Sequence, residues 1–276
     1  METLNDAAPK LRLRDVRKEF VLPRTGERTV ALEEIGLDVK AGEFLCIVGP
    51  SGCGKTTILN MIAGLTAPTG GRLELDGKRI EGPGAERGVV FQDYALFPWK
   101  TVRENIEFGP RYRKDSTLTK QQRDERVRHL IDLVALSGAE NKYPYELSGG
   151  MRQRCAFARA LANEPEVLLM DEPFAALDAQ TRVILQEELL RIWGETGAEA
   201  ERRTVVFITH GIDEAVFLAD RVVVMASHPG RIREVKAVDL PRPRKPEVRA
   251  SAAFQELVEH IWQLIRDEAY AATVRA

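Results

Sequence analysis

The sequence predicts an α/β fold in which a mostly parallel sheet is buried between helices. Five short apolar runs carry this prediction, because each is nearly continuous rather than alternating, as is typical of strands buried on both faces. Helix-like segments separate the runs, which is the pattern of an α/β core. The runs lie at residues 44–48, 88–91, 167–170, 205–208 and 222–225.

The composition agrees with a globular protein that buries at least one large core, since 44% of the 276 residues are hydrophobic and 30% are charged. The 40 basic and 42 acidic residues give a formal net charge of -2, so no overall positive field would attract nucleic acid or an anionic membrane. Three cysteines are too few for a disulfide framework and fit a reducing compartment. Without a signal-peptide pattern or an apolar stretch of about 20 residues, we expect the chain to serve any membrane from outside the lipid.

Two half-exposed strands are predicted before the first buried run. Residues 11–16 and 32–39 place apolar side chains among charged ones. Between them, Pro23 and Gly26 favour a turn, because proline fixes φ and glycine accepts a positive φ. We therefore expect a hairpin in this part of the chain.

Helices are predicted in the middle and at the end of the sequence. Residues 119–136 have apolar side chains at helical spacing, and Thr119 is a plausible N-cap. No strand-like run occurs at 96–160. After a proline-rich stretch, the apolar residues of a final amphipathic helix follow one face. These residues are Phe254, Leu257, Val258, Ile261, Trp262 and Ile265.

These patterns divide the chain into three parts. An α/β core with an antiparallel β portion is predicted at 1–95 and 160–235. A helical subdomain interrupts it at 96–159, and a C-terminal extension with the amphipathic helix occupies 236–276.

A phosphate-binding loop is predicted directly after the first buried strand. Residues 49–56 match the pattern G-x-x-x-x-G-K-[ST], and a helical pattern follows. The glycines let backbone N–H groups turn toward phosphates, Lys55 adds a cation, and Thr56 is placed to ligate Mg²⁺. The predicted nucleotide-binding residues are Gly49, Pro50, Ser51, Gly52, Cys53, Gly54, Lys55, Thr56 and Thr57. Cys53 is expected at an exposed position that thiol reagents could reach.

Two acidic residues follow the buried run at 167–170. Asp171 and Glu172 would lie at the carboxyl end of a strand, the edge where open α/β sheets bind ligands. Alone, such a pair is more often the solvated start of a helix, but a phosphate loop in the same chain favours a catalytic role. Asp171 would hold Mg²⁺ through water, and Glu172 would polarise the attacking water.

A second anion-binding helix start is predicted at 147–154, where Ser148 can cap a helix that begins with two glycines. Together with the phosphate loop and the acidic pair, this stretch resembles the signature motif of ATP-binding cassette (ABC) ATPases. The resemblance covers roughly residues 11 to 235, and its motifs arrive in the family's order. It implies a P-loop NTPase core of the ABC ATPase type, with an antiparallel β portion and an inserted helical subdomain.

The resemblance also implies roles for residues whose type alone would not reveal them. Gln92 matches the family's Q-loop glutamine, which contacts Mg²⁺ and the attacking water, and Asp178 lies in a stretch similar to the D-loop. His210 matches the switch histidine that contacts the γ-phosphate, and Phe20 occupies the place of the aromatic residue that stacks on adenine. The signature residues would close over ATP held by another subunit. They are Leu147, Ser148, Gly149, Gly150 and Met151.

The implied protein hydrolyses ATP with Mg²⁺ and pairs with a second ATPase subunit, either a copy of itself or a close paralogue. Its other partners would be transmembrane permease subunits and, indirectly, an extracytoplasmic substrate-binding protein, with no nucleic acid. It would lie peripherally on the cytoplasmic face of the inner membrane. Met151 and the stretches 91–99 and 238–244 look like the group of importer ATPases for nitrate, sulfonate, taurine or bicarbonate.

Several alternatives stay open at the level of sequence. An exporter or lipid-extraction ATPase has the same fold. A soluble ABC ATPase that acts on nucleic acid or ribosomes is disfavoured by the near-neutral charge and by a single cassette, and a P-loop kinase would not need 147–150 or His210. The bulky residues 97–99 are expected either to pack inside the helical insertion or to form a groove for a cytoplasmic helix of the permease.

Overall fold

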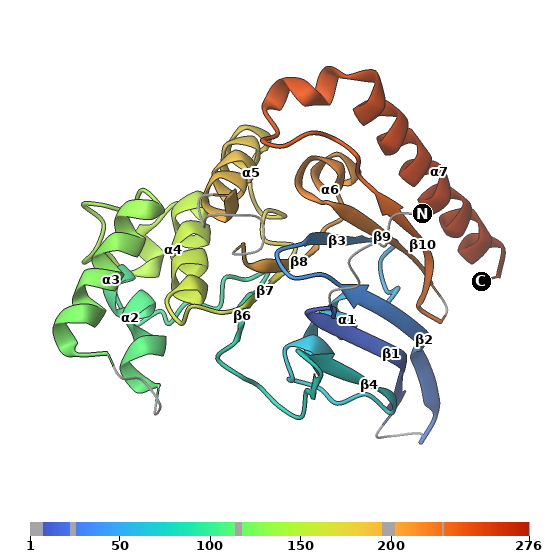
Figure 1. The fold of residues 1–276 in the computed structure, drawn as a ribbon, viewed down its shortest axis with the longest axis horizontal. Coiled ribbons are helices and arrows are strands. Elements are labelled where there is room, and N and C mark those ends of the chain that lie inside the picture. The colour runs from blue at the N-terminus through green and yellow to red at the C-terminus, as the bar shows by residue number, and fades with distance from the viewer. Residues whose placement is uncertain (1–7, 23–25, 114–117, 195–201, 228, 276) are drawn as a thin grey trace. The chain divides into compact units, whose positions relative to one another are not determined.

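The computed structural model describes residues 8–22, 26–113, 118–194, 202–227 and 229–275, with residues 269–275 described as backbone only. Its internal contacts divide the chain into two compact units (Figure 1). The first unit comprises 1–84 and 194–276, and the second comprises 85–193. These groupings differ from the three parts expected from the sequence, so the predicted division into core, helical subdomain and extension stays a prediction.

The first unit contains a four-stranded antiparallel sheet in the order β2-β1-β4-β5. The predicted hairpin is confirmed: β1 and β2 pair antiparallel, with Leu11 opposite Val39. Both strands are longer than expected, and the predicted turn residues 23–25 lie outside the described residues. The strands are β1 (Leu11–Val21), β2 (Arg28–Val39), β4 (Gly70–Leu75) and β5 (Lys78–Arg79).

The first unit also contains a parallel layer centred on β3 (Phe44–Val48), all of whose residues are buried. Strands β8 (Thr204–Ile208) and β9 (Arg221–Ala226) pair parallel with its two edges, as the apolar runs predicted. An unpredicted strand, β10 (Arg231–Ala237), pairs antiparallel with β9. Its sequence mixes charged and apolar residues, and charged side chains are tolerated on a strand at the edge of a sheet.

Three helices belong to this unit: α1 (Lys55–Ile62), α6 (Ile212–Leu218) and α7 (Ala252–Arg275), which follows a short 3-10 helix at Pro246–Ala250. Helix α7 packs against α6 and β9, and Figure 1 shows it running along them. Phe254 and Ile261 are buried, as the apolar spacing predicted. The prediction was wrong for Trp262, which is exposed and carries the Arg266 guanidinium 4.9 Å from its ring centroid.

The second unit pairs two parallel strands, β6 (Arg87–Val90) and β7 (Val167–Asp171). Between them, the described residues form helices and irregular structure and no strand, as expected. The Oγ1 of Thr119 accepts a hydrogen bond from Gln122 N at 3.3 Å, which confirms the predicted helix start. The helices are α2 (Val102–Tyr112), α3 (Lys120–Leu133), a 3-10 helix at Pro144–Glu146, α4 (Gly149–Leu161) and α5 (Ala179–Gly194). None of the helices in the described ranges is both long and apolar enough to cross a bilayer.

Candidate nucleotide site

The loop between β3 and α1 has a backbone course that requires glycine. Gly49, Gly52 and Gly54 have φ angles of +156°, +77° and +94°, which L side chains rarely adopt. A Cβ on Gly49 would lie 2.8 Å from the carbonyl oxygen of Met225. Gly54 is also the N-cap of α1, and because it has no side chain, the first amides of the helix stay available to an anion.

Lys55 closes this loop from the inside. Its side chain is buried, with 5% of the residue exposed. The ammonium donates hydrogen bonds to the carbonyl oxygens of Gly49 at 2.8 Å and Pro50 at 3.1 Å. The cation therefore lies within the curve of the loop, where the pattern G-x-x-x-x-G-K-[ST] predicts it, and Thr56 and Thr57 follow in the first turn of α1.

The expectation that Cys53 is exposed was wrong. The residue is fully buried, and its Sγ lies 3.8 Å from the Lys55 ammonium. Burial raises the pKa of the Cys53 thiol, although the neighbouring ammonium lowers it in part. The lack of access and the raised pKa both oppose modification at neutral pH, because a thiol reagent must reach the sulfur and reacts with the thiolate. Cys53 acts here as a small residue that fits beneath the loop.

His210 lies at the same edge of the parallel layer as the phosphate loop. Ile47 on β3 pairs with Ile208 on the parallel strand β8. The phosphate loop and His210 therefore follow the carboxyl ends of two neighbouring strands. The imidazole is exposed. The chain then turns into α6, where Oγ1 of Thr209 accepts a hydrogen bond from Gly211 N at 2.9 Å and lies against the Glu214 carboxylate.

Phe20, the predicted adenine-stacking residue, lies near the end of β1. Its ring is exposed, with the Lys18 ammonium 5.1 Å from its centroid. An exposed aromatic face on a strand is suited to stacking on a base. The stacking role of Phe20 stays a prediction.

In the second unit, the predicted acidic pair and the predicted Q-loop glutamine lie at the carboxyl ends of two neighbouring parallel strands, β7 and β6. Val90 pairs with Met170, so Gln92 and Glu172 each lie two residues beyond that pair. Asp171 is the last residue of β7 and only 8% exposed. Burying a carboxylate is costly unless it is hydrogen-bonded or paired with a cation. Glu172 has a φ of +46°, an uncommon backbone state for a residue with a side chain.

The predicted signature serine caps α4, as expected. The Ser148 Oγ accepts a hydrogen bond from Met151 N at 3.3 Å. A Cβ on Gly149 would meet Leu177 at 3.3 Å, and one on Gly150 would meet Thr181 at 3.1 Å. The two glycines therefore let the start of α4 lie close to the segment 177–181, which contains the predicted D-loop.

Asp178 has a structural role that the sequence analysis did not include. Its Oδ1 accepts a hydrogen bond from Thr181 N at 2.9 Å at the start of α5, and this contact lowers the pKa of its carboxyl group. Aspartate is among the preferred N-caps, so the residue type followed by a helical pattern was a usable signal.

Sequence reasoning also missed the contact that fixes the segment after Gln92. Tyr94 and Ala95 have positive φ angles of 64° and 44°. Their carbonyl oxygens accept hydrogen bonds from the Arg159 guanidinium, at 2.9 Å and 2.5 Å. Arg159 belongs to α4, and burial lowers its pKa. A non-glycine residue with positive φ carries no clear mark in a sequence.

Comparison with known proteins shows the family to which the chain belongs. A family model described as ABC transporter matches residues 32–175, just over half of the chain. This chain belongs to the ABC transporter family. The predicted recognition and the predicted ABC ATPase fold are both confirmed, and the chain is an ATPase of the cassette type.

Three curated members of the ABC transporter family are similar to the chain over most of their length. An uncharacterised ABC transporter ATP-binding protein of Methanocaldococcus jannaschii is 52% identical over 94% of this chain and 92% of its own. The taurine import ATP-binding protein TauB of Roseobacter denitrificans is 51% identical, with coverages of 81% and 80%. The nitrate import ATP-binding protein NrtD of Synechococcus elongatus is 50% identical, with coverages of 84% and 82%.

A solved ABC cassette has the same fold. A dimeric ATP-binding cassette in a post-hydrolysis state, bound to ADP and phosphate, has a TM-score of 0.72 with this chain. The two chains are 31% identical, and the alignment covers 84% of this chain and 100% of the solved one.

Proposed function

We propose that this chain is the ATP-hydrolysing subunit of an ABC importer for a small anion of the taurine or nitrate class. The phosphate loop carries the activity, because its glycine backbone and enclosed lysine form a cradle for the phosphates of ATP. The two curated relatives named for taurine and nitrate import, each at least 50% identical, support the substrate class.

The predicted residues divide the hydrolysis between them. Lys55 binds the β- and γ-phosphates, and Phe20 stacks on the adenine. Glu172 accepts a proton from the attacking water, since a carboxylate can act as a general base. It directly follows Asp171, the last residue of β7. Gln92 orients that water. His210 donates a hydrogen bond to the γ-phosphate while the bond between this phosphate and ADP breaks.

The side chains predicted to ligate Mg²⁺ are of the chemical type that this ion takes. Thr56, Asp171 and Gln92 offer a hydroxyl, a carboxylate and an amide oxygen, the hard ligands that this ion prefers. Bound with ATP, the ion would neutralise charge on the phosphates. Thr56 would hold it directly and Asp171 through water.

A second subunit completes the proposed site. The start of α4 offers the Ser148 hydroxyl, two glycines and the partial positive charge of a helix N-terminus. We propose that these groups bind the γ-phosphate of ATP held by another copy or a close paralogue. The dimeric form of the similar solved cassette supports this assembly.

An aromatic patch in the second unit supports a permease partner. We give this name to Phe97, Trp99, Phe108 and Tyr112. The ring centroid of Phe97 lies 5.8 Å from that of Trp99 and 4.5 Å from that of Phe108, which in turn lies 5.0 Å from that of Tyr112. Trp99 is 70% and Tyr112 60% exposed, so these rings do not all pack inside the insertion. Exposed apolar surface of this kind is typical of a docking site, and we propose that a cytoplasmic helix of the permease binds it. The subunit would then lie peripherally on the cytoplasmic face of the membrane.

Replacing Trp99 by alanine is expected to separate the subunit from its permease. Tagged Trp99→Ala should retain less permease than the wild type when solubilised membranes are purified with Mg-ATP, at an unchanged melting temperature. Mass spectrometry and quantitative blotting measure the recovered permease. Tyr145→Ala is the matched control, since Tyr145 is exposed in the same unit but outside the patch. Equal recovery for all three proteins would contradict the docking site.

Uptake by intact cells tests the function as a whole. Cells that lack the chain should lose uptake of labelled taurine, nitrate or another small anion of this class, and the wild-type chain should restore it. The Glu172→Gln chain should assemble with the permease without restoring uptake. An exporter would be indicated instead by two results. Cells that lack the chain would take up every tested anion at the wild-type rate, and wild-type cells would lose an internal solute faster than these cells do.

A further inference from the structure

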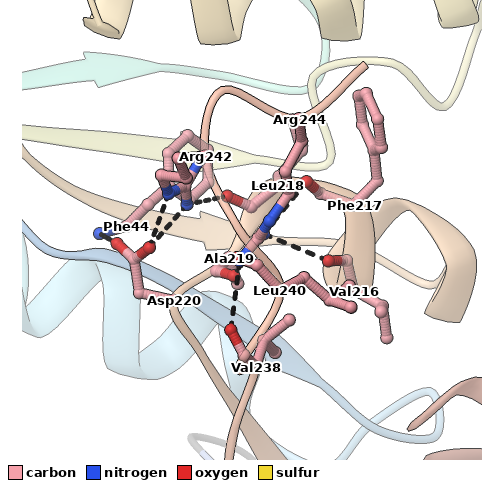
Figure 2. A network of polar contacts seen from close by, with 10 residues as sticks. All are labelled: Phe44, Val216, Phe217, Leu218, Ala219, Asp220, Val238, Leu240, Arg242 and Arg244. Atoms are coloured by element: carbon pink, nitrogen blue, oxygen red, sulfur yellow. Dashed lines mark hydrogen bonds and ion pairs between the residues drawn. The ribbon is translucent and has the colours of Figure 1, made fainter. Parts of the chain in front are cut away.

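Two arginines from the C-terminal extension cap the end of α6 (Figure 2). Arg244 is 7% exposed, and its guanidinium points at the last turn of the helix. The final carbonyl groups of a helix lack partners within the helix, and a cation there is favourable. The bonded carbonyls are those of Val216 at 3.2 Å, Phe217 at 3.1 Å and Ala219 at 2.6 Å for Arg244, and of Leu218 at 2.7 Å for Arg242.

The same two side chains tie this helix end to other parts of the unit. The second amino group of Arg244 donates to the Val238 carbonyl oxygen at 3.2 Å, within the extension. The Arg242 Nε lies 2.8 Å from Asp220, whose other carboxylate oxygen accepts a hydrogen bond from Phe44 N at 2.9 Å. Phe44 begins β3, the strand that leads into the phosphate loop. The arginines therefore join the extension, α6 and β3.

Such a cluster is costly, because two guanidinium groups lie close together and one of them is buried. Burial and the neighbouring Arg242 lower the pKa of Arg244 to about 10, so it stays charged at neutral pH. Its several carbonyl partners offset the lost hydration, since hydrogen bonds to a charged donor are stronger than neutral ones.

The other end of α6 carries His210. The helix begins only two residues after the histidine and has seven residues, or about 10 Å of length. Residues 215–218 on α6 are fully buried. Because a short, packed helix moves as a rigid body, the arginines at its end restrain the backbone that carries the imidazole.

We propose that Arg244, with Arg242, is a positioning residue for His210. The extension thereby contributes to hydrolysis, although neither arginine is among the predicted nucleotide-binding residues. This inference rests on the proposed function in one respect, namely that His210 acts on the γ-phosphate. Loss of Arg244 should therefore lower kcat and leave the KM for ATP nearly unchanged.

A double-mutant cycle in the full chain tests this dependence. We expect Arg244→Ala to lower kcat about fivefold or more, and to lower it no further in a His210→Ala background, because coupled residues are not additive. Losses that multiply in the double variant would overturn the positioning role. If His210→Ala alone hydrolyses ATP like the wild type, the proposed function of His210 fails instead.

The histidine ring signals give a readout that does not depend on hydrolysis. The chain has four histidines, so the ¹³Cε1–¹H signal of His210 can be assigned from its loss in His210→Ala. We expect Arg244→Ala to shift or broaden this signal while the His129 signal stays in place. Arg233→Ala is the matched control, because Arg233 lies on β10 and ties that strand to the Leu264 carbonyl on α7 rather than to α6.

Arg244→Lys covers the case in which the alanine variant does not fold. Lysine keeps the charge but cannot span several carbonyls as the planar guanidinium does. We expect an intermediate kcat and an intermediate shift of the His210 signal. An unchanged His210 signal in either folded variant would overturn the proposal.

Discussion

Glu172→Gln is expected to bind ATP normally and to hydrolyse it at least about 100-fold more slowly than the wild type, the usual range for a lost general base. Glutamine keeps the shape of the side chain but cannot accept a proton from water. Because ATP then persists, the dimer that encloses it should persist as well. Single-turnover hydrolysis and size-exclusion chromatography with Mg-ATP measure the two effects.

Glu166→Gln is the matched control for this result. Glu166 is an exposed residue just before β7, at the opposite end of the strand that delivers Glu172. The same chemical change at that end should leave hydrolysis unaltered. Near-normal turnover by Glu172→Gln would show that another group activates the water.

Lys55→Ala is expected to fail at the earlier step, with a dissociation constant for ATP raised about 100-fold or more. A hydrogen bond to a charged group contributes about 1.5–3 kcal/mol, and the ammonium would bond at least two phosphate oxygens. The same substitution removes its bonds to the Gly49 and Pro50 carbonyls, which hold the loop in shape. Titration calorimetry with ATP measures the change.

Lys78→Ala controls for the loss of one positive charge, since Lys78 is exposed on β5. Its affinity for ATP should equal that of the wild type at moderate salt. Tight binding by Lys55→Ala would contradict the phosphate-loop assignment. The two catalytic predictions are separable, because Glu172→Gln retains the ATP that Lys55→Ala cannot bind.

The buried strands and the phosphate loop could be predicted because their determinants are local. A continuous apolar run identifies β3, and the glycine spacing after it specifies the backbone course at Gly49 and Gly54. The cap of α4 by Ser148 could be predicted for the same reason. Each depends on residues within a few positions of one another, which is where sequence patterns are strongest.

The errors and omissions depend on distant residues instead. Cys53 is buried because the chain packs over it, and Trp262 is exposed because only part of α7 is covered. The prolines and arginines at 241–246 indicated a break in regular structure, whereas Arg242 and Arg244 hold a helix end. Arginine is so seldom buried that no local pattern would have placed Arg244 in the interior.

The bonds from Arg159 to Tyr94 and Ala95 have a mechanical consequence. They attach the segment just after Gln92 to α4, a regular helix of 13 residues whose first turn is capped by Ser148. Roughly 15 Å of helix separates Arg159 from that cap. A displacement of the segment after Gln92 would therefore move α4 as a rigid body and shift Gly149 and Gly150 at its other end. No residue between them would need to change its conformation.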